Sequence, residues 1–123
     1  MKICFRIWLD NDGRAFGEGT YRLLKAIQRT GSLNQASTEM RMSYRKAWDV
    51  LNVTEKRLGF ELVERKTGGT SGGGTVLTSA GSTFVNQYEQ LRQEASEALD
   101  SLYRKYFTEN ENDTTDSPEN EPN

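Results

Sequence analysis

A tight turn between two helices constrains the fold of this chain more than any other feature. Ser32 followed by Gln35 fits a capping box, in which the Ser hydroxyl and the Gln side chain satisfy free amides at a helix start. This helix is expected to end near Glu39, and residues 40–42 are expected to make the turn. A second helix begins directly after that turn.

The second helix is amphipathic. Ser43 is a good N-cap for it, and it is expected to run to Leu58 and to stop at Gly59. At 100° per residue its apolar face holds Ala47, Trp48, Leu51 and Leu58. Its polar face holds Arg45, Lys46, Asp49, Asn52 and Lys56. The helix is therefore expected to bury one face and to expose the other.

A glycine-rich hairpin follows the two helices. Residues 61–66 and 75–78 are strand-like, and five of the eight residues 67–74 between them are glycine. The loop lacks the Lys of a phosphate-binding P-loop, and a strand rather than a helix follows it. Short helix, tight turn, amphipathic helix and hairpin are together typical of a winged helix-turn-helix.

In such domains the second helix enters the major groove of DNA, and its exposed N-terminal half meets the base edges. Arg45 and Lys46 can donate to guanine or to phosphate. Asp49 can accept from cytosine, or it can fix Arg45 or Lys46 in a helix-spaced ion pair. The alternative is a solvated polar face on a core helix, but the capped helix before it and the wing after it favour DNA.

The other candidate contacts lie around this face. Ser32 and Gln35 are caps first and phosphate contacts second, whereas Tyr44 borders the face and Trp48 is interpreted as structural. The glycine loop can bring its amides close to the DNA backbone. The candidate DNA-binding residues are Ser32, Gln35, Ser43, Tyr44, Arg45, Lys46, Asp49, Arg65, Lys66, Gly68, Gly69 and Gly72.

Two further elements are expected before the tight turn. Residues 2–9 alternate apolar and polar side chains and predict a strand, and residues 10–13 predict a turn. Residues 18–30 predict a helix that ends at Gly31.

A long helix is expected from Ser79 to about Phe107. Its apolar residues follow a heptad spacing that favours pairing with a second copy, and the alternative is packing on the domain itself. The candidate dimer contacts are Phe84, Tyr88, Leu91, Ala95, Ala98 and Leu102.

Charge is distributed unevenly along the chain. Residues 1–107 hold all 16 basic residues and 12 of the 18 acidic ones, a net charge of +4, whereas residues 108–123 hold six acidic residues and no basic one. The basic body favours a polyanion, and the polar acidic tail is expected to be disordered.

Composition argues against several function classes. The chain has no histidine and a single cysteine, Cys4, so an intramolecular disulfide is excluded and neither an enzyme nor a metal site is expected. Residues 1–10 do not match a signal peptide, and no apolar run reaches the length of a membrane span. A cytoplasmic protein without a membrane partner is therefore expected.

Six segments carry a resemblance to a known family. They are Gly17-Glu-Gly-Thr-Tyr-Arg-Leu-Leu-Lys-Ala-Ile27, Thr30-Gly-Ser-Leu-Asn-Gln-Ala36, Met42-Ser-Tyr-Arg-Lys-Ala-Trp-Asp49, Leu62-Val-Glu-Arg65, the glycine loop and Val76-Leu-Thr-Ser-Ala-Gly81. The chain resembles the N-terminal domain of ModE-type molybdate-responsive regulators and, more broadly, the winged helix-turn-helix of LysR-type regulators.

The resemblance covers about residues 2–105 and implies a dimeric transcription regulator whose long helix pairs the subunits. It places residues 43–46 on the recognition helix, and Arg65, Lys66 and the glycine loop on the wing. Full-length members carry a C-terminal molybdate-binding module, where this chain has the acidic tail. A single-domain form is therefore expected, with no cofactor and no molybdate-binding residues.

These observations predict a mainly α fold with a small β content. A winged helix-turn-helix is expected over residues 1–78, a dimerisation helix over 79–107 and a disordered tail over 108–123. The expected partners are double-stranded DNA and a second copy of the chain. The alternative function is a protein-interaction module, with the winged helix as scaffold and the long helix as the binding surface.

Overall fold

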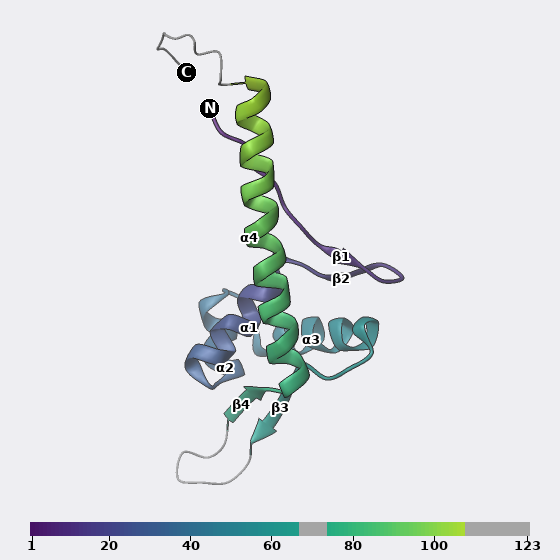
Figure 1. Ribbon diagram of the computed structural model, residues 1–123. Coiled ribbons are helices and arrows are strands. Elements are labelled where there is room, and N and C mark those ends of the chain that lie inside the picture. The colour runs from purple at the N-terminus through teal and green to yellow at the C-terminus, as the bar shows by residue number, and fades with distance from the viewer. Residues whose placement is uncertain (67–73, 108–123) are drawn as a thin grey trace. The chain divides into compact units, whose positions relative to one another are not determined.

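The computed structural model describes residues 1–66 and 74–107 (Figure 1). The elements are β1 (Leu9–Asp10), β2 (Arg14–Phe16), α1 (Glu18–Thr30), α2 (Leu33–Glu39), α3 (Tyr44–Leu58), β3 (Val63–Lys66), β4 (Gly74–Leu77) and α4 (Ser79–Phe107). Contacts divide the chain into two compact units, one of Ile7–Tyr88 and one of Met1–Arg6 with the stretch from Glu89 onward. The expected glycine contacts Gly68, Gly69 and Gly72 and the acidic tail lie outside the described residues.

The strand expected over residues 2–9 is wrong for most of its length. Only β1 forms, and it pairs antiparallel with β2 through Leu9 opposite Phe16 and Asp10 opposite Arg14. A strand needs a neighbour to satisfy its backbone groups. The returning strand β2 has only three residues before α1 begins, so it provides no backbone hydrogen-bond partners for residues 2–8.

Helices α1 and α2 begin and end as expected. Gly31 ends α1 in the left-handed region at φ +71°, where a glycine fits without a steric penalty. The Ser32 hydroxyl accepts the backbone N–H of Gln35 at 3.0 Å, so this half of the capping box is confirmed. Arg41, at φ +58°, makes the sharp bend after α2, and the N–H of Met42 donates to the Ser37 carbonyl at 3.0 Å.

Helix α3 also follows the expectation. The Ser43 hydroxyl accepts the backbone N–H of Lys46 at 3.0 Å, and Gly59 ends the helix at φ +88°. Ala47 and Leu51, on the inner face of α3, are fully buried. The five residues of the expected polar face are all exposed: Arg45, Lys46, Asp49, Asn52 and Lys56.

The wing is anchored at its base by both neighbouring helices. Strands β3 and β4 pair antiparallel from Val63 opposite Leu77 to Lys66 opposite Gly74. The N–H of Thr75 donates to the carbonyl of Gly31 at 3.0 Å, which ties β4 to the end of α1. Glu55 of α3 accepts the N–H of Leu62 at 2.7 Å just before β3. Figure 1 shows this hairpin beside α1 and the first turns of α4.

The first turns of α4 complete the core of the Ile7–Tyr88 unit. Phe16 lies 4.8 Å from Phe84 and 4.9 Å from Tyr88, measured between ring centroids. The Tyr88 hydroxyl donates to the carbonyl of Ile7 at 2.8 Å, and Val85 is fully buried. This unit therefore extends into α4 beyond residue 78, where the sequence placed the boundary. The expected fold class, a winged helix-turn-helix with a long C-terminal helix, is confirmed.

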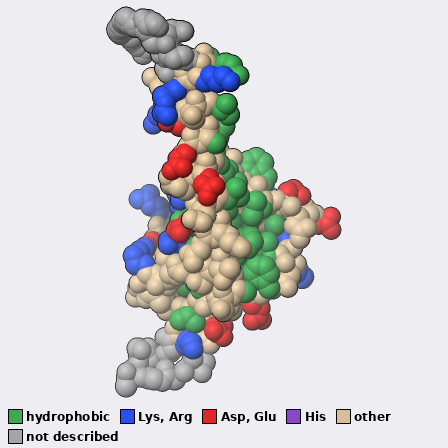
Figure 2. All heavy atoms as spheres, in the orientation of Figure 1, with side chains coloured by type: hydrophobic (Ala, Val, Ile, Leu, Met, Phe, Trp, Pro, Cys, Tyr) green, Lys and Arg blue, Asp and Glu red, His purple; other side chains and the backbone are tan. Residues whose placement is uncertain are grey.

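The second unit places Met1–Arg6 with residues 89–107 of α4. One side of this helical stretch is half-buried, with Ala95, Leu99 and Tyr103. Neighbouring positions of the same stretch expose large apolar residues, among them Leu91 at 45% and Leu102 at 49%. Figure 2 shows hydrophobic side chains on the surface of this half of the helix. Within residues 1–66 and 74–107, no helix combines the length and hydropathy that a membrane crossing requires.

Candidate nucleic-acid interface

The N-terminal turn of α3 presents a compact group of polar and basic side chains. Ser43 caps the helix, and Tyr44, Arg45 and Lys46 directly after it are exposed, Tyr44 at 44%. The start of a helix carries unpaired backbone N–H groups and a partial positive charge. Two cations at this end add to a field that attracts anions.

Arg45, Lys46 and Asp49 are not tied to one another by ion pairs. Among the described residues, none of the three has an oppositely charged group within 4.0 Å. The helix-spaced pair that the sequence allowed for Asp49 is therefore not formed. Both cations are free to meet an external acceptor, and the Asp49 carboxylate is free to meet an external donor.

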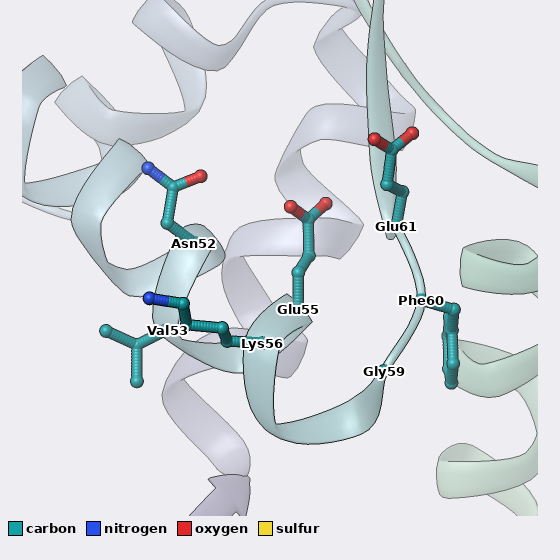
Figure 3. Close-up of a pocket in the computed structure, with 7 residues that line it drawn as sticks. All are labelled: Asn52, Val53, Glu55, Lys56, Gly59, Phe60 and Glu61. Atoms are coloured by element: carbon teal, nitrogen blue, oxygen red, sulfur yellow. The ribbon is translucent and has the colours of Figure 1, made fainter.

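An open hollow of about 610 Å³ borders the C-terminal half of α3 (Figure 3). It is lined by Asn52, Val53, Glu55, Lys56, Gly59, Phe60 and Glu61. Glu55 is committed to the backbone N–H groups of Leu62 and Val63, at 2.7 and 3.3 Å. In Figure 3 the Phe60 ring points toward α4, where it lies 5.7 Å from the Phe84 ring. Structural roles thus account for two of the lining side chains.

Val53 is the surface residue that sequence reasoning missed. It is 52% exposed and stands between Asn52 and Lys56 on the outer side of α3. An exposed apolar side chain on such a helix can pack on the methyl group of thymine. The sequence could have indicated this exposure, because at 100° per residue Val53 lies next to Asp49 and Lys56 on the helix surface.

Arg65 and Lys66 of β3 are exposed at the base of the wing. The guanidinium carbon of Arg65 lies 4.9 Å from the centre of the Trp48 ring on α3. The Tyr44 ring is nearly perpendicular to the same ring, with centroids 6.4 Å apart and planes at 84°. Trp48, interpreted from the sequence as structural, therefore connects β3 at the root of the wing to α3.

The remaining candidates separate into caps and core residues. Ser32 is half-buried and its hydroxyl is engaged in capping α2, whereas Gln35 is exposed. Phe84 is half-buried and Tyr88 is 2% exposed, both within the Ile7–Tyr88 core. A residue as buried as Tyr88 cannot contact a second copy. The dimer prediction therefore depends on Leu91, Ala95, Ala98 and Leu102.

An ion pair fixes α1 to α2 on the outer surface of the helix-turn-helix. The Arg29 guanidinium donates to both carboxylate oxygens of Glu39, one at 3.1 Å. This hydrogen bond raises the pKa of Arg29 and lowers the pKa of the Glu39 carboxyl. The pair therefore links α1 to α2, the helix that packs against α3.

No group of three or more His, Cys, Asp or Glu side chains that could hold a metal ion is found within the described parts of the chain. The candidate surface consists of basic, polar and aromatic side chains around one exposed helix and the root of a β-hairpin. That combination defines the class of DNA-binding winged helix-turn-helix transcription regulators.

The family follows from comparison with known sequences. A model described as "Bacterial regulatory helix-turn-helix protein, lysR family" matches residues 20–82. The chain belongs to this family, which is a family of transcription regulators and not of enzymes, and it is homologous to the N-terminal region of ModE.

Curated relatives carry the names expected from the resemblance. The chain is 42% identical over 98 residues to the molybdenum transport protein ModE of Azotobacter vinelandii, which is 79% of this chain and 36% of that protein. It is 42% identical over 81 residues to the transcriptional regulator ModE of Haemophilus influenzae, 66% of this chain and 32% of that one. The chain spans about a third of the length of these relatives.

Two solved structures share the fold. The chain of a CbnR DNA-binding domain in complex with DNA has a TM-score of 0.56 and 21% identity, and the match covers 72% of this chain and 97% of that one. ArgP from Mycobacterium tuberculosis has a TM-score of 0.52 and 22% identity, with 71% of this chain and 31% of that chain covered.

Proposed function

We propose that this chain binds double-stranded DNA sequence-specifically as a homodimer and regulates transcription. Helix α3 would enter the major groove with Tyr44, Arg45, Lys46 and Asp49 toward the base edges and adjacent phosphates. The wing would contact the backbone or the minor groove. The site of action would be the cytoplasm, where bacterial DNA lies.

One observation carries this proposal: the N-terminal turn of α3 is exposed, and its two basic side chains form no ion pair with any residue that the structure describes. The turn is capped by Ser43, and the helix beneath it is fixed by the buried Ala47 and Leu51. A preorganised helix loses little conformational entropy on binding. A protein that shares the fold has been solved in complex with DNA, which supports DNA as the partner of this chain.

The wing root supports a second set of contacts. Arg65 and Lys66 place two exposed cations on the strand that leads into the glycine-rich loop. Basic side chains at such a position bind phosphates and fix the register of the protein on the duplex. Gly68, Gly69 and Gly72 would let the loop backbone approach the DNA closely.

The exposed apolar side of α4 supports the dimer. Leu91 and Leu102 are about half exposed, and Ala98 lies between them at helical spacing. Such a stripe is normally covered by a partner in solution. A second copy of the chain would present a second α3, so the bound site would have two related halves.

Selection from a random-sequence library of DNA duplexes tests this proposal. The expected result is enrichment of one motif with two inverted halves, because a two-fold dimer reads the same sequence twice. Failure to enrich any sequence at moderate salt would overturn the proposal. A single unrepeated half would retain DNA binding and overturn the two-fold arrangement.

A further inference from the structure

Trp48 and Arg65 form a contact that joins two separate elements of the winged domain. Trp48 lies on α3 and Arg65 on β3, and the guanidinium carbon is 4.9 Å from the ring centre. A guanidinium within about 6 Å of an indole centroid is attracted by the electron density of the ring. Such a contact restricts the positions that the charged end of the long Arg side chain can take. This restriction costs side-chain entropy when the contact forms.

The ring face of Trp48, rather than its N–H group, makes this contact. The indole Nε1 is buried and has no hydrogen-bond partner among the described residues. Trp48 is half-buried and packs against the hydrophobic core of the unit, and no described residue pairs with its N–H group. Besides this core packing, the Trp48 ring contacts the Arg65 guanidinium on its face and the Tyr44 ring, whose plane lies at 84° to its own.

Arg65 keeps its hydrogen-bonding capacity while it is held. Its side chain is exposed, and no carboxylate of a described residue pairs with it. Guanidinium N–H donors form a planar fork that matches two oxygens of a phosphate, which a lysine ammonium cannot do. A fixed, unpaired fork beside the recognition helix is suited to a backbone phosphate.

We propose that Trp48 is a positioning residue that holds Arg65 in place to bind a phosphate of the DNA backbone. The role rests on the proposed function and adds to it, because it assigns part of the binding energy to a residue that does not touch DNA. The contact also fixes the wing root relative to α3, so both would meet the duplex in one register.

Substitutions of Arg65 separate its charge from its shape. The probe is a labelled duplex recovered by selection from the random-sequence library, measured by fluorescence anisotropy over a range of salt concentrations. Arg65→Lys keeps the charge and removes the planar fork, so binding is expected to weaken about five-fold with an unchanged salt slope. Arg65→Gln is also expected to reduce the steepness with which log affinity falls against log salt concentration, by about 0.9, because the protein then neutralises one phosphate fewer.

Substitutions of Trp48 test the positioning role itself. Trp48→Phe keeps an aromatic face and is expected to bind the duplex nearly as well as the unaltered chain. Trp48→Leu is expected to weaken binding as much as Arg65→Lys, and the double variant no further, since both changes remove the same interaction. Far-ultraviolet circular dichroism checks that each variant is folded.

The chain contains a matched control pair. The Arg14 guanidinium carbon lies 4.4 Å from the ring centre of Trp8, in the other hairpin of the same unit. Arg14→Lys is expected to leave duplex affinity unchanged. In a Trp8→Phe background Trp48 is the remaining tryptophan, so its fluorescence is expected to change with Arg65→Lys even without DNA.

The possible failures are distinguishable. If the unaltered chain binds no duplex, the proposed function and this role are both overturned. If it binds but Arg65→Lys binds equally well, or if the effects of Trp48→Leu and Arg65→Lys add in full, the positioning role is wrong and the proposed function stands.

Discussion

At the scale of single residues, the absence of one methyl group at Gly81 lets α4 pack directly on the backbone of Leu62. A Cβ placed there would lie 2.2 Å from the Leu62 carbonyl oxygen. We expect Gly81→Ala to destabilise the protein by about 2 kcal/mol, because backbone must shift to admit the added carbon. Urea unfolding followed by circular dichroism measures the change.

Gly19 provides the control for this prediction. It also lies in the first turn of a helix, but an added Cβ would meet nothing within 4 Å. Gly19→Ala is expected to stabilise the protein by about 0.5–1 kcal/mol through lower backbone entropy in the unfolded chain. Equal effects of the two substitutions would refute the packing argument.

The ion pair between Arg29 and Glu39 predicts a pH dependence. Hydrogen bonding to Arg29 lowers the pKa of Glu39 below its ordinary value of 4.5. The pair therefore stabilises the fold above pH 4.5, and this stabilisation disappears as the pH falls through the lower folded-state pKa. Both side chains are exposed, so the effect is small.

Comparison with Glu39→Gln isolates this effect. The unaltered chain is expected to be slightly more stable than the variant at neutral pH and equally stable in strong acid, as measured by urea midpoints. A stability difference that stays constant from neutral to acid pH would show that the charge of Glu39 is not its source.

Single residues differ in how far the sequence revealed their roles. The caps Ser32 and Ser43 were predicted because capping depends on neighbours three residues away along the chain. The approach of Arg65 to Trp48 could not be predicted, because it depends on how two distant segments meet. Tyr88 fits the heptad spacing equally well as a core residue and as a dimer contact, and packing alone decided between them.

At the scale of elements, the start of α3 depends on one hydroxyl. The Ser43 side chain accepts the N–H of Lys46 and so fixes the turn that carries the proposed base contacts. Ser43→Ala is expected to destabilise the protein by about 1 kcal/mol in urea unfolding, whereas Ser43→Asp retains a cap and is expected to cost much less. Ser96→Ala on the exposed side of α4 provides a surface control. Equal stability of Ser43→Ala and Ser43→Asp would argue against a capping role.

The helices were predictable as elements and the first strand was not. Each helix carries its own start and stop signals and its own periodicity, as α1 and α3 show with Gly31 and Gly59 in the left-handed region. The alternation of residues 2–9 is also a local signal, but a strand forms only where a partner exists. The short β2 was set by the early start of α1, which the alternation did not encode.

At the scale of the whole molecule, the proposed dimer covers the apolar side of α4 with a second copy of the chain. The double substitution Leu91→Lys plus Leu102→Lys is expected to convert the dimer to a monomer, since each chain would bury two charges in the interface. Analytical ultracentrifugation at micromolar concentration measures the state. The control substitution Ser96→Lys plus Ser101→Lys, at exposed polar positions of the same helix, is expected to leave the oligomeric state unchanged. A double Leu variant that remains a dimer would place the interface elsewhere.

The central claim is that the N-terminal turn of α3 reads DNA, and a salt titration of duplex binding tests it most directly. The measurement compares the unaltered chain with Arg45→Ala plus Lys46→Ala, on the selected duplex. A control with Lys2→Ala plus Arg6→Ala removes the same charge from exposed positions outside the winged unit. We predict at least about a ten-fold weaker affinity for the α3 variant, a salt slope lower by about 0.9 for each phosphate that is no longer neutralised, and little change for the control. Equal affinity of the α3 variant and the unaltered chain at moderate salt would contradict the claim.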